Sequence, residues 1–146
     1  MVEMDCAIFI LATLLNSGGK FESATKLQKL AFLSIYENGM DPFTNFKWHH
    51  YGPYSKELQD TVNILTEEGL VNEETIERIS YSGNLYTVKR LTLTPEGRAK
   101  INDEIDVVDE KSKVALVKTL AQYGNKPLAR ILDYVYKAYN SQDFIE

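Results

Sequence analysis

Residues 46–71 of this 146-residue chain, FKWHHYGPYSKELQDTVNILTEEGLV, constrain its fold more than any other stretch. They hold an aromatic run, a turn, and a helix with a marked beginning and end. Gly52 and Pro53 favour the turn, since glycine tolerates positive φ and proline fixes its own φ. Ser55 can cap the helix with its hydroxyl group, and Gly69 suits the left-handed position just beyond the helix end. The sequence therefore predicts a helix between these two residues.

The helix over residues 55–68 has one apolar and one polar face. Its apolar residues recur at spacings of three and four, which predicts a core-facing stripe of Leu58, Val62 and Leu65. Three polar residues have donors that can read guanine or adenine in a major groove: Lys56, Gln59 and Asn63. The charges oppose that use, because residues 55–68 hold one base and four acids, and each acid repels phosphate. A solvated or protein-facing helix is the other interpretation.

Residues 70–94 predict a β-hairpin, because two segments rich in Ile, Tyr, Val, Thr and Leu flank the turn-forming residues 82–84. The alternation of apolar residues shifts at Lys89 and Arg90, which predicts a β-bulge there. These two bases can hold DNA phosphates, although exposed bases also protect the edges of ordinary sheets.

Five further helices are expected, over residues 5–16, 23–37, 94–108, 110–124 and 127–139. In the second of these we expect Lys26 and Lys29 to point outward from an apolar stripe. In the helix over 110–124 the predicted packing stripe consists of Val114, Val117, Leu120 and Ala121. Tyr134 and Tyr136 of the last helix point away from its own stripe and can cover a partner.

Residues 40–54 contain five of the chain's 16 aromatic residues. Such density favours a hydrophobic lid over the helices, and a base-stacking platform is the alternative. The candidate partner-binding residues of this segment are Phe43, Trp48, Tyr51 and Tyr54. We also expect residues 46–51 to form a strand that pairs with the hairpin.

Composition narrows the class of protein. The chain is 44% hydrophobic and 25% charged, as ordinary globular domains are, and no apolar run reaches the roughly 18 residues that cross a bilayer. Its single cysteine, Cys6, excludes an intramolecular disulfide and favours the reducing cytoplasm. Residues 1–110 hold ten bases and eighteen acids, whereas residues 111–137 hold six bases and one acid. That basic region can bind a polyanion, bind the acidic body of a second copy, or be simply solvated.

Little in the sequence indicates catalysis. His49 and His50 are adjacent, and adjacent strand residues point to opposite faces, so they do not share a metal easily. No spacing of Cys and His residues matches a zinc site, and no glycine-rich phosphate loop is present. We therefore expect no cofactor, no metal and no enzymatic activity. A deep pocket lined by His49, His50 and Tyr51 would favour an enzyme instead.

Two segments resemble known families. The pattern Leu65-x-x-x-Gly69-Leu70-Val71, followed by the LTLTPEGR segment at 91–98, resembles winged helix-turn-helix regulators of the PadR and MarR type. The resemblance implies DNA binding and a dimer formed by C-terminal helices. The segment KLQKLAFL at 26–33, followed by an aromatic run and YGPYS at 51–55, resembles the YwgA-like proteins and the Panacea antitoxin domain. The Panacea branch of that resemblance implies binding and neutralising a toxin protein.

These observations predict a mainly helical fold with a small antiparallel β-hairpin, namely a winged helix-turn-helix with additional C-terminal helices. A winged-helix-like domain is expected over 1–98 and a C-terminal helical region over 99–146, together forming one structural unit. The leading functional hypothesis is a homodimeric, DNA-binding or transcription-associated regulator. The alternative is a protein-binding antitoxin or adaptor module without DNA binding. The alternative is favoured by the 16 residues that separate the two helices, because a DNA-binding helix-turn-helix joins them by a short turn.

Overall fold

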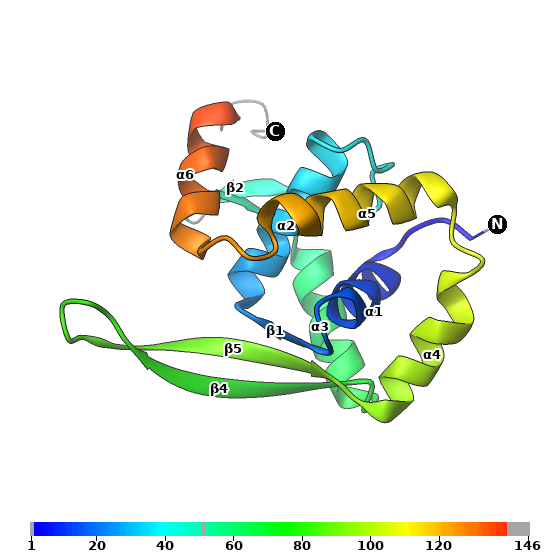
Figure 1. Cartoon of the computed structure of the whole chain (residues 1–146), viewed down its shortest axis with the longest axis horizontal. Helices are drawn as coiled ribbons and strands as arrows, with labels where there is room; N and C mark the ends of the chain where they lie inside the picture. Colours follow the sequence, from blue (N-terminus) through cyan, green and yellow to red (C-terminus); the bar gives the residue numbers. More distant parts are fainter. Residues whose placement is uncertain (1, 51, 140–146) are drawn as a thin grey trace.

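The computed structural model describes residues 2–50 and 52–139, which form helices and antiparallel strands (Figure 1). The elements, in chain order, are α1 (Cys6–Asn16), β1 (Lys20–Glu22), α2 (Ala24–Tyr36), β2 (Lys47–His49), β3 (Gly52–Tyr54), α3 (Lys56–Glu67), β4 (Val71–Ile79), β5 (Leu85–Leu93), α4 (Pro95–Ile105), α5 (Glu110–Tyr123) and α6 (Leu128–Ala138).

Side-chain caps fix where the first five helices begin. In each case a serine, threonine or aspartate oxygen accepts a hydrogen bond from the backbone N–H three residues later, which satisfies a donor that the helix itself leaves free. The capping residues are Asp5, Ser23, Ser55, Thr94 and Asp109. At the other end of α3, Gly69 has φ +76°. The helix starts predicted at residues 23, 55 and 94 are therefore confirmed, as is the left-handed glycine after α3.

The larger sheet has the strand order β1-β5-β4, and both pairings are antiparallel. The β4–β5 register runs without interruption from Val71 opposite Leu93 to Ile79 opposite Leu85. The predicted bulge at Lys89 and Arg90 is therefore wrong. The apolar alternation shifts there because the hairpin leaves the body of the protein, so its outer half has no core to face (Figure 1).

A second, two-stranded sheet joins β2 to β3. The prediction that residues 46–51 pair with the hairpin is wrong, because Trp48 lies opposite Pro53 within this small ribbon. The strand that pairs with β5 on this side is β1 instead, with Phe21 opposite Leu91. Tyr51 lies outside the described residues.

Helix α1 lies at the centre of the core, with α3, α4 and α5 packed around it, while α5 and α6 pack on α2 (Figure 1). Residues from all six helices belong to one cluster of buried side chains, including Phe9, Phe32, Leu58, Ile101, Leu116 and Ile131. The predicted packing stripe of α5 is largely wrong, because Val114 and Val117 are each 56% exposed and Ala121 is exposed too. Only Leu120 of that stripe packs against the core, and it is half-buried. Ala115 and Leu116 are buried in their place, since α1 and α2 lie against that other face of the helix.

The fold is a mixture of helices and antiparallel strands. The expected helices and the small antiparallel hairpin are present, but the expectation of a mainly helical fold is corrected by the additional strands. Strands β1 and β3 were not expected, and β2 was expected as a strand but with the hairpin as its partner. Within the described part of the chain, no helix has both the length and the apolar character needed to cross a membrane.

Candidate functional site

The outer face of α3 carries all three residues predicted to read bases. Lys56 and Asp60 form an ion pair of 2.7 Å one helical turn apart. The amide nitrogen of Gln59 donates to Asn63 Oδ1 over 3.4 Å. Ile64, on the same helix, is 51% exposed. The face therefore presents amides, a paired base and an exposed apolar side chain, together with acids at the end of the helix.

The β4–β5 hairpin, which we call the arm, projects well beyond the body of the protein (Figure 1). Its bases are held by carboxylates. Lys89 Nζ lies 3.8 Å from Glu73 and donates to Thr75 Oγ1 over 3.0 Å. Arg90 pairs with Glu22 of β1 at 3.1 Å, and Arg78 pairs with the same carboxylate.

The two arginines stabilise the ionised carboxylate of Glu22 in β1. The hydrogen bond from Arg90, with the neighbouring Arg78, lowers the pKa of Glu22 below its ordinary value.

Beyond these charges, four apolar side chains near the end of the arm are exposed: Ile79, Tyr81, Leu85 and Tyr86. The arm therefore ends in apolar surface, and its bases are already paired with acids.

The aromatic segment turns most of its side chains toward the protein. Phe43 stacks on Phe9 of α1 with ring centroids 5.2 Å apart, and Trp48 packs against Tyr136 of α6 at 5.7 Å. The ring of Tyr54 lies 4.9 Å from that of His49. Tyr51, the remaining candidate contact residue of this segment, lies outside the described residues. This arrangement supports the interpretation of the segment as a lid.

Helix α6 is held to the body by tyrosines. Tyr136 donates to the His50 carbonyl over 2.8 Å, and the hydroxyl of Tyr134 donates to the carboxylate of Glu37, which also accepts from Tyr123 of α5. Tyr134 and Tyr136, which were expected to cover a partner, therefore contact other parts of this chain. Both side chains nevertheless remain more than a third exposed.

Two neighbouring side chains of α2 hold the segment that leads into α3. Gln28 donates to the Ser55 carbonyl over 2.9 Å and accepts from the Ser55 N–H over 2.8 Å. Lys29 donates to the Pro53 carbonyl over 2.7 Å. Lys29 is only 1% exposed, so the prediction that it points outward is wrong. It is drawn inward because residues 52–55 bring a free backbone carbonyl to its amine.

Beside this contact lies a pocket of about 220 Å³ between α2, the β2–β3 ribbon and α3. Its lining includes Gln28, Lys29, His49, His50 and Gln59. The pocket brings together residues from three elements that no local motif connects. Among the described residues, no group of three or more His, Cys, Asp and Glu side chains is placed to hold a metal ion.

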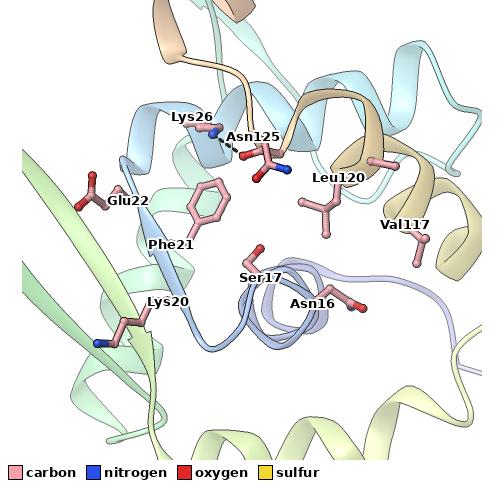
Figure 2. A pocket seen from close by; sticks show the side chains of 11 residues that line it. Asn16, Ser17, Lys20, Phe21, Glu22, Lys26, Val117, Leu120 and Asn125 are labelled. Atoms are coloured by element: carbon pink, nitrogen blue, oxygen red, sulfur yellow. Dashed lines mark hydrogen bonds between the residues drawn. The ribbon is translucent and has the colours of Figure 1, made fainter.

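A larger pocket of about 590 Å³ lies where the end of α1, β1 and the start of α2 face α5 (Figure 2). The ring of Phe21 points into it, with Leu120 and Val117 of α5 on the opposite side. Lys26 closes one edge by donating to the Gly124 carbonyl over 2.6 Å, and burial lowers its pKa. The pocket is open and its lining is mixed in polarity. Of the two lysines that line it, Lys26 is half-buried and Lys20 is exposed.

No protein-family model, no curated protein and no solved structure matches this chain.

Proposed function

We propose that this chain is a winged-helix module that binds a protein partner through α3 and the arm. The element order supports the first part of the proposal. In a winged helix, a helix, a short strand and two more helices precede a hairpin, and the short strand pairs with the hairpin's second strand. Here α1, β1, α2 and α3 precede β4 and β5, and β1 pairs with β5. The β2–β3 ribbon is an insertion between the second and third helices.

The charges of α3 and the arm favour a protein partner over DNA. Four bases lie on α3, β4 and β5, and each forms an ion pair with a carboxylate: Lys56, Arg78, Lys89 and Arg90. Phosphate that approached these bases would compete with the carboxylates already paired with them. Residues 55–68 also carry three more acids than bases, so the helix that would approach the DNA groove repels phosphate.

The same surface fits a partner with a basic and partly apolar face. The acids Glu67 and Glu68 end α3, and Ile64 adds exposed apolar surface on the same helix. The apolar end of the arm extends this surface outward. Protein interfaces combine apolar contacts with charge complementarity that steers the encounter. A toxin or adaptor protein with a cationic face meets these requirements.

The test is affinity capture from the native host with three tagged proteins: wild type, a Glu67→Lys/Glu68→Lys variant, and an Asp103→Lys/Asp106→Lys control. The control makes the same charge change on and after α4, where the acids are also exposed. We expect wild type and control to retain a common protein that the α3 variant loses. Identical sets of captured proteins from all three would contradict the proposal.

DNA binding is the second candidate, and the exposed donors of Lys56, Gln59 and Asn63 on one helix face are the observation that favours it. These residues would read bases while Lys89 and Arg90 held phosphates. Titration against mixed-sequence duplex DNA at about 50 mM salt tests it, since phosphate contacts are least screened there. Saturable binding that weakens in a Lys89→Gln/Arg90→Gln variant would establish this candidate in place of the protein partner.

A further inference from the structure

Lys29 is a buried base with no counter-ion in the part of the chain that the structure describes. Its side chain is 1% exposed, and its amine makes one hydrogen bond, to the Pro53 carbonyl, among the described residues. No described carboxylate pairs with it, and burial alone lowers its pKa to about 8. Lysine side chains are almost never fully buried unless they are paired, because an unpaired buried charge is costly. The amine therefore has two unused donors and no negative partner among these residues.

A pocket bordered by Lys29 has room for such a partner. Lys29 lines the pocket of about 220 Å³ described above, and none of the described residues that line this pocket is an acid. His49 and His50 enter the lining from the β2–β3 ribbon, Gln59 from α3, and Thr25 from the same helix as Lys29. All four can donate hydrogen bonds. The wall of the pocket is thus rich in donors and holds one positive charge.

We propose that this pocket binds a small anion with a carboxylate or phosphate group, which serves as the counter-ion of Lys29. The anionic oxygens would accept from the Lys29 amine and from donors at His49, His50 and Gln59. The pocket, at about 220 Å³, has room for several waters and therefore for an anion the size of acetate or phosphate.

Such an anion would act on the surface that the proposed function uses. Its contacts would join α2, the ribbon and Gln59 of α3, so the bound state would favour one placement of α3 relative to α2. The larger pocket offers no equivalent site, because neither of its lysines, Lys20 and Lys26, is fully buried and its lining also contains the acid Glu22. The anion would therefore be an effector of a binding module rather than a substrate. Its binding can be measured without knowing the macromolecular partner.

The test uses isothermal titration of the full chain with sodium acetate and with inorganic phosphate, at constant ionic strength with chloride as the reference salt. We expect at least one probe to bind saturably at a single site. Lys29→Met should weaken it by about tenfold or more, and Gln59→Ala by several-fold. Lys26→Met is the matched control, since it removes an amine from the same helix that also bonds a carbonyl, and it should leave binding unchanged.

Absence of saturable binding by both probes in the wild-type chain would overturn the proposal, as would equal affinity in wild type and Lys29→Met. If Lys29→Met does not fold, the His50→Ala and Gln59→Ala variants test the site, because both residues line the pocket and neither is buried. Unchanged binding in both of those variants would place the anion elsewhere and overturn the assignment. A result of phosphate alone or acetate alone supports the site and identifies which group the ligand bears.

Discussion

Replacing Gln28 with alanine tests how α2 fixes the beginning of α3. The Gln28 side chain is 3% exposed and makes hydrogen bonds of 2.9 Å and 2.8 Å to the carbonyl and the N–H of Ser55, a residue that is itself fully buried. In the Gln28→Ala variant the carbonyl keeps a weaker bond from the Gln59 N–H at 3.3 Å. The Ser55 N–H keeps no partner among the described residues.

The magnitude follows from these contacts. Each lost hydrogen bond is worth about 1 kcal/mol net, and an orphaned buried donor costs about 1–3 kcal/mol. The free energy of unfolding should therefore fall by about 2–4 kcal/mol. Urea denaturation followed by circular dichroism measures it, and with a slope of about 2 kcal/mol/M the midpoint should drop by about 1–2 M.

Gln122→Ala is the matched control for this variant. It removes an exposed glutamine that accepts a hydrogen bond from Asn38 at 3.0 Å, so it should change stability by less than about 0.5 kcal/mol. A Gln28→Ala protein as stable as this control would show that α2 does not hold the start of α3.

Three further predictions concern stability and assembly. Gly97→Ala should prevent folding or cost more than about 3 kcal/mol in a thermal melt, because a Cβ there would lie 2.0 Å from the Leu70 carbonyl oxygen; a melting temperature within a few degrees of wild type would contradict this. The pKa of Lys29 falls from 10.5 to about 8 on folding, so the unfolded chain holds this proton where the folded chain has lost it. The stability of wild type relative to Lys29→Met should therefore rise between pH 8 and pH 10.5, by on the order of 3 kcal/mol in urea melts without carboxylate or phosphate buffers, and a flat difference would refute it. The exposed Val114 and Val117 of α5 predict a homodimer that Val117→Glu converts to a monomer in light scattering, and a monomeric wild-type chain would refute it.

Local signals were enough to predict where helices begin. The caps at Ser23, Ser55 and Thr94 act within three residues, so the sequence alone contains both partners of each hydrogen bond. The hairpin was foreseen for a similar reason, since its two strands are adjacent in the chain. Strand β1 was missed because three residues carry no periodic pattern, and its partner lies about 70 residues away.

The pocket and the placement of Lys29 depended on contacts that no local pattern records. Helical periodicity assigned Lys29 to the outer face, but the Pro53 carbonyl, 24 residues later, draws its amine inward. The same limit explains Val114 and Val117. Both faces of α5 contain small or apolar residues, so the choice of the buried face was made by how α5 lies on α1 and α2.

Site-directed photocrosslinking in the native host tests most directly whether α3 meets a protein. A benzophenone amino acid would replace Ile64, which is half-exposed on α3, and in a matched protein Asn102, which is exposed on α4. We expect a discrete protein adduct from position 64 that position 102 does not give. Adducts to DNA alone from position 64, or no adduct that distinguishes the two positions, would contradict a protein-binding role for α3.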